Sequence, residues 1–479
     1  MHIPRSDNEA QRFSHALELW RRGDVAQAEA ILHELVARRP AREDFSTLLA
    51  EVLRNQGRLD TASRVIFECC KAGGFDPDVS LRGAKFIQQC HRHGLADELC
   101  RATIARGAVS SEMWFVAGNI ARELGDFDRA RTDYLAALEA GVDLNSSMVF
   151  GALARTQRYR DPAHPDFAKF LAHFDNSGFS VRARAATGFG LAKAYDDIGE
   201  WRTAAGVLRK ANALVRTVQS WDSSGWHQFV EARARARVAR LRSTIAPDFV
   251  PVFILGLPRT GTTLTATRLA SHIGARDRGE LRVLRFVAEE LIRGGHLDNV
   301  GAIGEAARLY CAHARQDDAP ARYYMDQDPL NFRYLDLIEA MFPQAQIIHC
   351  RRDRGDTALS LWSQDFAHPD CAFAYDFDSI ADYMAGHDEL MAHWRRTLSL
   401  PIHTVDYELL VTEPQLVLRE LAGSIGAPER TAPEAQVTPI NSSSVWQARQ
   451  PIYTSSVGRW RAYLPFVPEL AKFATGTGG

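Results

Sequence analysis

The chain has 479 residues, 46% of them hydrophobic, and its 57 Lys and Arg residues nearly balance its 59 Asp and Glu residues. This length predicts two or three domains, and a net charge of −2 gives no sign of a general nucleic-acid binder. Seven scattered cysteines without a C-x2-C spacing indicate buried thiols rather than a zinc site or a disulfide framework. No run approaches the roughly 18 apolar residues of a membrane span, and the first residues lack an apolar leader-like core, so we expect a cytoplasmic protein.

The first half of the sequence has a helical pattern with recurring glycines. A glycine followed five positions later by alanine occurs at 23–28, 57–62, 125–130 and 199–204, and a weaker copy with leucine lies at 94–99. The first two copies are 34 residues apart. The pattern resembles the tetratricopeptide repeat, a two-helix unit in which glycine ends the first helix and the small residue lets the second pack closely. Two interpretations stay open: a concave surface that binds a peptide or protein partner, and a helical scaffold without a binding role.

The helical half ends in an arginine-rich stretch at 231–242, which we interpret as a solvated connecting helix. Pro247 and Pro251 follow, and the hydrophobic period changes there. We therefore predict a domain boundary near residue 245, with a helical repeat domain at 1–245 and a second domain at 246–479.

The second domain begins with a strand, a loop and a helix. The apolar run 252–255 predicts a buried parallel strand, and helical spacing begins at Thr262. Gly256 and Gly261 have the spacing of a phosphate-binding P-loop, in which backbone N–H groups and a helix N-terminus hold an anion. The lysine that grips β- and γ-phosphates in that motif is replaced by Thr262, and the cation of this loop is Arg259. Taken by itself, the spacing also fits a tight strand-to-helix turn.

Short apolar runs then alternate with helical stretches, which is typical of a parallel sheet with crossover helices. We predict further strands at 323–325, 346–350 and 401–405. Ligands of such sheets bind at the carboxyl ends of the strands. After the second of these runs come Arg352 and Ser360, which fit a second phosphate. The alternative for Arg352 is a simple ion pair with Asp353 at the strand end.

The loop Gly-x-Pro-Arg-Thr-Gly-Thr-Thr at 256–263 and the later Arg352-Asp353 with Ser360 together resemble a 3′-phosphoadenylyl-sulfate (PAPS)-dependent sulfotransferase. The resemblance covers about 250–465. With the repeats, the chain resembles bacterial tetratricopeptide-repeat sulfotransferases, whose transferase half is similar to protein-tyrosine sulfotransferases. It implies an N-terminal all-α solenoid followed by a P-loop-like α/β domain with a central parallel sheet.

The resemblance also implies roles for individual residues. The loop residues would hold the 5′-phosphosulfate, and the second cluster would hold the 3′-phosphate. A serine in a late loop, Ser444, aligns with one that stabilises the transition state. The implied cofactor-binding residues are Arg259, Thr260, Gly261, Thr262, Thr263, Arg352, Ser360, Tyr407, Arg449 and Arg459.

Glu280 lies 21 residues after Arg259, and the resemblance assigns it the role of catalytic base. The chemistry needs such a group, because the acceptor hydroxyl must lose its proton as it attacks sulfur. The alternative is an exposed glutamate at a helix start. His272 and His349 are other candidate bases, although we expect His349 to point from a strand into the core.

One departure from the family concerns the Asp-Lys-x-Pro element, which stands here as 326–329 with Gln327 in the place of the lysine. That lysine neutralises the bridging oxygen of the leaving phosphate. Loss of one preorganised donor of this kind typically costs about 10²- to 10³-fold in rate. Gln327 still offers a neutral hydrogen bond.

We therefore expect a PAPS-dependent sulfotransferase that acts on a hydroxyl of a peptide tyrosine or a small compound and releases 3′,5′-bisphosphoadenosine (PAP). No metal is required, since arginines and backbone amides hold the anion. A protein partner on the repeat groove is expected; nucleic acid and membrane are not. A P-loop kinase-like enzyme and a non-catalytic repeat scaffold with a lapsed transferase domain are the alternatives.

Overall fold

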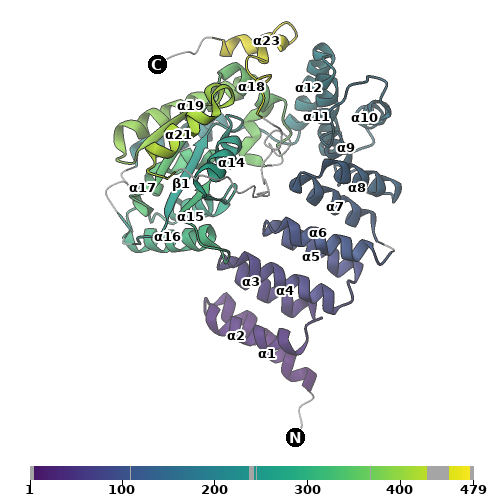
Figure 1. Cartoon of the computed structure of the whole chain (residues 1–479), viewed down its shortest axis with the longest axis vertical. Coiled ribbons are helices and arrows are strands. Elements are labelled where there is room, and N and C mark those ends of the chain that lie inside the picture. Colours follow the sequence, from purple (N-terminus) through teal and green to yellow (C-terminus); the bar gives the residue numbers. More distant parts are fainter. Residues whose placement is uncertain are drawn as a thin grey trace. The chain divides into compact units, whose positions relative to one another are not determined.

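The computed structural model describes residues 5–107, 109–236, 242–243, 245–366, 368–428 and 452–474 (Figure 1). The chain forms two compact units, and neither is a single continuous stretch. The first unit comprises Met1–Val142 and Cys311–Pro320, and the second comprises Asp143–Tyr310 and Ala321–Gly479. None of the described helices has the length and apolarity needed to cross a bilayer.

The first unit is a stack of helix pairs, in which each helix packs against its successor (Figure 1). The amphipathic pattern buries one face of each helix from residue 5 to residue 124 in a continuous apolar core. The predicted tetratricopeptide-like architecture of this region is confirmed. Its helices are α1 (Arg5–Arg21), α2 (Val25–Arg38), α3 (Glu43–Asn55), α4 (Leu59–Ala72), α5 (Pro77–Gln89), α6 (His93–Ile104), α7 (Ser111–Leu124) and α8 (Phe127–Glu139).

The turn inside each pair uses a left-handed residue, and these residues recur every 34 positions. Gly23, Gly57 and Gly125 have φ values of +85°, +76° and +85°, and His91 takes the same position with φ +58°. The weaker copy predicted at 94–99 is therefore wrong by three residues: the repeat runs from His91, and Gly94 lies inside α6. The pattern was missed because a histidine occupies a conformation that favours glycine. The small residues five positions later are all fully buried: Ala28, Ala62, Ala96 and Ala130.

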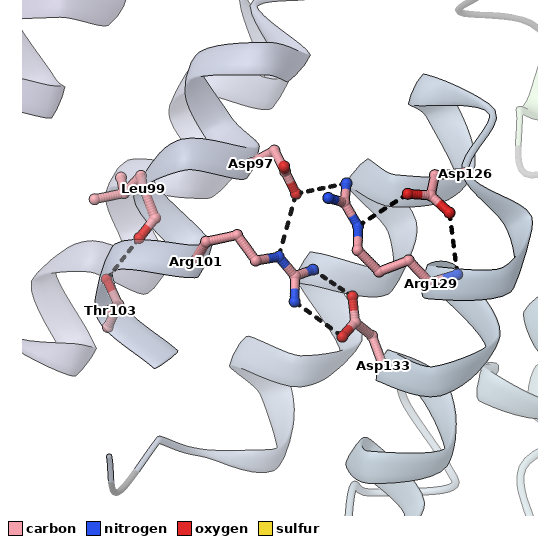
Figure 2. Close-up of polar contacts among 7 residues, drawn as sticks. All are labelled: Asp97, Leu99, Arg101, Thr103, Asp126, Arg129 and Asp133. Carbon is pink, nitrogen blue, oxygen red and sulfur yellow. Dashed lines mark hydrogen bonds and ion pairs between the residues drawn. The ribbon is translucent and has the colours of Figure 1, made fainter. Parts of the chain in front are cut away.

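Neighbouring repeats are also joined by an ion-pair network between α6 and α8, drawn in Figure 2. Arg101 of α6 pairs with Asp133 of α8, whose side chain is almost fully buried. Arg129 of α8 reaches back to Asp97 of α6 at 2.9 Å. Asp126 caps the N-terminus of α8 by accepting from the Arg129 backbone N–H at 3.1 Å. The two arginines therefore bridge the helices in both directions.

The short segment Cys311–Pro320 completes the first unit. It contains the last turn of α16 (Val300–Arg315) and then Asp317. The two carboxylate oxygens of Asp317 accept from the backbone N–H groups of Asp60 and Thr61, each at 2.7 Å. Helix α4 has no side-chain cap of its own, so Asp317 supplies the missing N-terminal acceptors. A Cβ on Gly57 would lie 2.5 Å from the Ala312 carbonyl oxygen, so glycine is needed there for this close approach.

The second unit starts with five helices and continues into the sheet domain. The Gly199 copy of the repeat lies between α11 and α12, where Gly199 has φ +81°. These helices belong to the same compact unit as the sheet. The boundary near residue 245, at which we predicted the change from helical repeats to the sheet domain, therefore stays a prediction. The helices are α9 (Val149–Leu153), α10 (Pro165–Asp175), α11 (Val181–Asp197), α12 (Trp201–Arg216) and α13 (Ser223–Arg235).

Helix α13 is more than the solvated connector that we predicted. Its Trp226 ring stacks on Tyr383 with ring centroids 4.5 Å apart. Arg233 is 3% exposed and forms a buried ion pair with Asp336. The arginine-rich pattern was misinterpreted because its partner lies about a hundred residues away. Only the helix's other face, with Arg235, is exposed.

The sheet has five parallel strands in the order β2-β3-β1-β4-β5. Strand β1 lies at the centre and pairs with β4 from Val252 opposite Gln346 to Gly256 opposite Cys350. The predicted parallel sheet is confirmed, and the two-residue strand β2 is an addition to it. The strands are β1 (Val250–Gly256), β2 (Arg276–Asp277), β3 (Tyr323–Asp326), β4 (Gln346–Arg351) and β5 (Ile402–Asp406).

Helices cover both faces of the sheet. On one face, Ile254 and Ile348 pack with apolar residues of α14 and α21 in one core cluster. On the other face, Phe253 packs against Tyr310 and Phe342. The remaining elements are α14 (Thr262–Ile273), α15 (Arg282–Arg293), η2 (Pro329–Tyr334), α17 (Leu335–Met341), α18 (Arg354–Trp362), η3 (Pro369–Tyr375), α19 (Phe377–Thr397), α20 (Tyr407–Thr412), α21 (Pro414–Ser424), α23 (Trp460–Tyr463) and η4 (Pro468–Phe473).

Candidate active site

The loop between β1 and α14 is shaped by residues that need special backbone geometry. Gly256, Arg259 and Gly261 have φ values of +147°, +74° and +97°. A Cβ on Gly256 would lie 2.4 Å from the Cys350 carbonyl oxygen, and one on Gly261 would lie 2.7 Å from the Tyr407 ring. Glycine is therefore required at both positions. Arg259 adopts a left-handed conformation that is uncommon for a side-chain-bearing residue, which marks the loop as a strained functional segment.

The threonines of this loop lie at its helical end. Thr260 is buried and donates its hydroxyl to the Leu257 carbonyl at 2.7 Å, which fixes the turn. Thr262 and Thr263 are buried and form the first turn of α14. A helix N-terminus presents backbone N–H groups and the positive end of its dipole. The loop therefore has the geometry of an anion cradle.

Arg259, Arg352 and Ser360, predicted from two separate motifs, lie together at the carboxyl ends of β1 and β4. The Arg259 Nε donates to the Ser360 hydroxyl at 3.0 Å, and Arg352 Nη1 donates to the Arg259 carbonyl at 3.2 Å. Burial, and after it the charge of Arg352, lowers the pKa of Arg259 to about 10. Two like charges held this close favour a bound anion. The buried Nε of Arg352 has no partner among the described residues and so is available to a ligand.

Tyr407 and the final part of the chain complete this side of the site. The guanidinium of Arg352 lies 4.5 Å from the centre of the Tyr407 ring. Arg352 Nη2 donates to the Ser456 carbonyl at 2.8 Å, and the Tyr407 and Ser456 hydroxyls are hydrogen-bonded at 2.8 Å. The sequence reasoning missed Ser456, because no motif distinguishes it from the serine and threonine beside it.

The predicted catalytic residues Glu280 and Gln327 follow the neighbouring strands β2 and β3. The Gln327 backbone N–H donates to the Gly279 carbonyl at 2.9 Å, which joins the two strand ends. Burial, and after it the charge of Asp328, raises the pKa of Glu280 to about 8. The positive charge of Arg259 lowers the pKa of Glu280. The strand ends that carry Glu280 and Gln327 are therefore electrostatically coupled to the cradle. The Gln327 side chain is 2% exposed, and its Oε1 has no partner in the described part of the chain.

A buried carboxyl that we did not single out, Asp326, ties the two strand ends together. Its Oδ1 accepts from the Leu281 and Asp328 backbone N–H groups at 3.2 and 3.1 Å. Its Oδ2 accepts from the Tyr310 hydroxyl at 3.3 Å. Burial, together with the neighbouring Asp328, raises the pKa of Asp326 to about 8. Glu280 is thus flanked by carboxyls, whose charges add to the effect of burial in raising its pKa.

The remaining predicted residues have different surroundings. Arg459 forms an ion pair with Asp196 of α11. Ser444 and Arg449 lie outside the described residues. His349 is 5% exposed, its Nδ1 accepts from Arg395 Nη2 at 3.2 Å, and its pKa is well below its usual value because it is buried. His349 therefore lies in the core, as expected. His272 lies near the end of α14, the helix that starts at the cradle.

Two families match separate parts of the chain. Residues 251–431 match the sulfotransferase family, and residues 13–63 and 94–143 match the tetratricopeptide repeat. An Aquifex aeolicus protein described as uncharacterized is 33% identical over 308 residues, which cover 59% of this chain and 40% of that protein. Protein-tyrosine sulfotransferase 1 of Danio rerio is 25% identical over 243 residues, which cover 42% of this chain and 63% of the relative. The chain thus spans less than two thirds of the length of either relative.

Among solved structures, the sulfotransferase domain of the Synechococcus PCC 7002 olefin synthase is 19% identical, with a TM-score of 0.34 over 50% of this chain and 99% of that one. Sulfotransferase STF9 from Mycobacterium avium is 14% identical, with a TM-score of 0.28 over 62% of this chain and 97% of that one. The sulfotransferase match covers the strands of the parallel sheet, and the tetratricopeptide-repeat matches cover the helix pairs near the N-terminus. The chain thus joins a region that matches the tetratricopeptide repeat to a region that matches the sulfotransferase family.

Proposed function

We propose that this protein transfers a sulfuryl group from PAPS to an acceptor hydroxyl and releases PAP. The observation that carries the proposal is the convergence of Arg259, Arg352, Ser360 and Tyr407 beside a glycine-shaped loop at a helix N-terminus. Such a cluster offers anion-binding groups on two sides of one loop. This arrangement suits a nucleotide with charged groups at both its 5′ and 3′ positions.

The residues present fit such a donor. The strained cradle between β1 and α14 is free of side-chain Cβ atoms at Gly256 and Gly261, and the buried Arg352 Nε lacks a described partner. The cradle, with Arg259, Thr260, Gly261, Thr262 and Thr263, would hold the 5′-phosphosulfate. Arg352, Ser360 and Tyr407 would hold the 3′-phosphate. When bound, the donor supplies the sulfuryl group and a phosphate leaving group.

Glu280 accepts the proton of the acceptor hydroxyl in this proposal. Its raised pKa makes it a stronger base once ionised, and its position beside Gln327 places it at the end of strands that border the cradle. Gln327 donates a neutral hydrogen bond where related enzymes use lysine. Arginine and backbone N–H groups supply the positive charge that metal-dependent enzymes obtain from an ion. Arg449, Arg459 and Ser444 remain proposed donor and transition-state contacts.

We further propose a peptide tyrosine as the acceptor, because the Danio rerio relative is a protein-tyrosine sulfotransferase and tetratricopeptide repeats commonly bind peptides. The test is transfer of ³⁵S from labelled PAPS to a library of tyrosine peptides and small phenols by the full chain. Labelled peptides support the tyrosine acceptor, and labelled phenols alone contradict it.

The site residues are tested in the same assay. Arg259→Ala and Glu280→Ala are expected to reduce transfer by at least about 10²-fold. Arg216→Gln, which breaks an ion pair with Asp376 away from the site, serves as the matched control. Full activity in both site variants would contradict the assignment. Stabilisation of the wild type by ATP with Mg²⁺ but not by PAP would favour a kinase, and an absence of turnover with every donor would favour a scaffold.

A further inference from the structure

Three groups of contacts fix the part of the chain that lies beside Arg352. We call residues 452–463 the anchor segment. At one point Ser456 contacts Arg352 and Tyr407, each through a hydrogen bond of 2.8 Å. This contact makes the anchor segment a direct neighbour of the proposed 3′-phosphate site. Its own conformation therefore matters for the donor.

The middle of the anchor segment is fixed to α18. The Asp356 carboxylate, which is 2% exposed, accepts from the Gly458 and Trp460 backbone N–H groups at 2.6 and 3.0 Å. The Trp460 ring covers Gly355 so closely that a Cβ there would lie 2.6 Å from it. Helix α18 also carries Ser360. The segment is thus docked on the helix that contributes to the same site.

The third attachment is to α11, in the last repeat-like helix pair. Asp196 forms an ion pair with Arg459, and its Oδ1 accepts from the Tyr463 hydroxyl at 2.6 Å. The Tyr463 side chain is 1% exposed and Asp196 is 18% exposed, so the hydrogen bond between them is shielded from water, whereas the Arg459 side chain of the ion pair is 39% exposed. Hydrogen bonds to a charged group in such surroundings are among the stronger ones in proteins. Asp196 lies outside the ranges that match either family, 13–63 and 94–143 for the repeats and 251–431 for the transferase.

We infer that Asp196 is a positioning residue for the donor: it holds the anchor segment against Arg352 and Tyr407, so that the last repeat-like helix pair sets the affinity for the 3′-phosphate. The inference rests on the proposed function. It gives Arg459 a different role from direct contact with the nucleotide. In this arrangement the guanidinium of Arg459 faces Asp196 and acts by anchoring the backbone on which Ser456 lies.

The test is isothermal titration of PAP into the full chain and its variants. Asp196→Asn keeps the size of the side chain and removes the charge, and we expect the Kd for PAP to rise about tenfold. In the transfer assay the donor KM should rise by a similar factor, while kcat and the acceptor KM stay near the wild-type values. Arg216→Gln of α12, which breaks an ion pair with Asp376 and leaves the anchor segment untouched, should bind PAP as the wild type does.

The variants separate the two roles of Arg459. If Arg459 contacts the nucleotide directly and Asp196 competes for it, Asp196→Asn will bind PAP more tightly, which overturns the inference. An unchanged Kd also overturns it. Should Asp196→Asn unfold at a lower temperature than Arg216→Gln, Tyr463→Phe takes its place, because it removes one hydrogen bond and keeps the ion pair.

Failure of the proposed function has a different signature. If the wild type neither binds PAP nor turns over PAPS, the proposed function is wrong. The proposed effect of Asp196 on donor affinity is then wrong as well. Amide hydrogen exchange of residues 452–463 then decides the anchoring itself. Faster exchange in Asp196→Asn than in Arg216→Gln supports the anchor, and equal exchange rejects it.

Discussion

At the scale of single residues, the candidate site combines a pair of arginines with a group of carboxyls. Burial lowers the pKa of Arg259, and the repulsion between Arg259 and Arg352 lowers it further. Burial also raises the pKa of Glu280, Asp326 and Asp328, and repulsion by the charge of Asp328 raises the pKa of the first two further. An anion bound at the arginines relieves the first repulsion, and a proton on the carboxyls relieves the second. The site is therefore arranged to take up negative charge and protons.

The pH dependence of transfer follows from Glu280. A base must be ionised to accept a proton, and the pKa of Glu280 is raised to about 8. We expect the rate at saturating PAPS to rise with a midpoint near pH 8 and to level off above about pH 9. Glu280→Gln should lose the activity. A histidine base such as His349, whose pKa is lowered by burial, would instead give a rise whose midpoint lies well below that of Glu280.

Gln327 offers a gain-of-function test. Gln327→Lys puts a charged donor into a buried position beside carboxyls that stabilise it. We expect kcat to rise by at least about tenfold, since a preorganised charged donor typically contributes 10² to 10³ in rate. The midpoint of the pH profile should also fall, because the new cation favours ionised Glu280. Gln327→Met keeps the size without a donor and should be slower than the wild type; equal kcat values for all three proteins would exclude a role for position 327.

At the scale of elements, positions with a local steric demand could be predicted, and those that depend on distant partners could not. Gly256 and Gly261 are recognisable because their spacing and positive φ values belong to one short loop motif, although a Cβ there would meet Cys350 and Tyr407 of other elements. His91 was missed because its left-handed turn lacks the expected glycine. The role of Asp196 could not be predicted, since 267 residues separate it from Tyr463. Strand β2 has only two residues, too few for a hydrophobic pattern.

The N-terminus of α4 provides a stability test for an element. Asp317→Ala removes the acceptors of the Asp60 and Thr61 N–H groups. We expect it to lower the free energy of unfolding of the first unit by about 1 kcal/mol, as loss of an N-cap does. Urea unfolding followed by circular dichroism measures this against the wild type. Equal stability of the variant and the wild type would show that water replaces the carboxylate without loss.

At the scale of the whole molecule, the chain combines two compact units, and the architecture of repeats followed by a parallel sheet was predictable from the helix and strand patterns together with the family resemblance. The extent of each unit was not. The helical pattern continues through α13 without a signal that α9 to α13 pack in the same unit as the sheet. Contacts such as Trp226 on Tyr383 arise from tertiary packing, for which helical spacing carries no information.

Calorimetry tests this division. The proposed donor site lies wholly in the second unit, so PAP should raise the temperature of one unfolding transition and leave the other in place. At a hundredfold excess over its Kd, PAP is expected to stabilise the second unit by about 2.7 kcal/mol. Arg352→Ala should abolish the shift. A single transition that moves as a whole would show that the units unfold together.

The segment Cys311–Pro320 belongs to the first unit, whereas the chain on both sides of it belongs to the second. This has a consequence for gene recombination and for protein engineering. A genetic crossover at one point near residue 142 would exchange the helix pairs and leave this decapeptide behind. Asp317 would then face the start of a foreign helix, and Ala312 would meet whatever residue replaces Gly57. Chimaeras that carry the decapeptide together with its matching repeats should therefore fold better than those joined at a single site. In this protein the repeats and residues 311–320 must change as one piece.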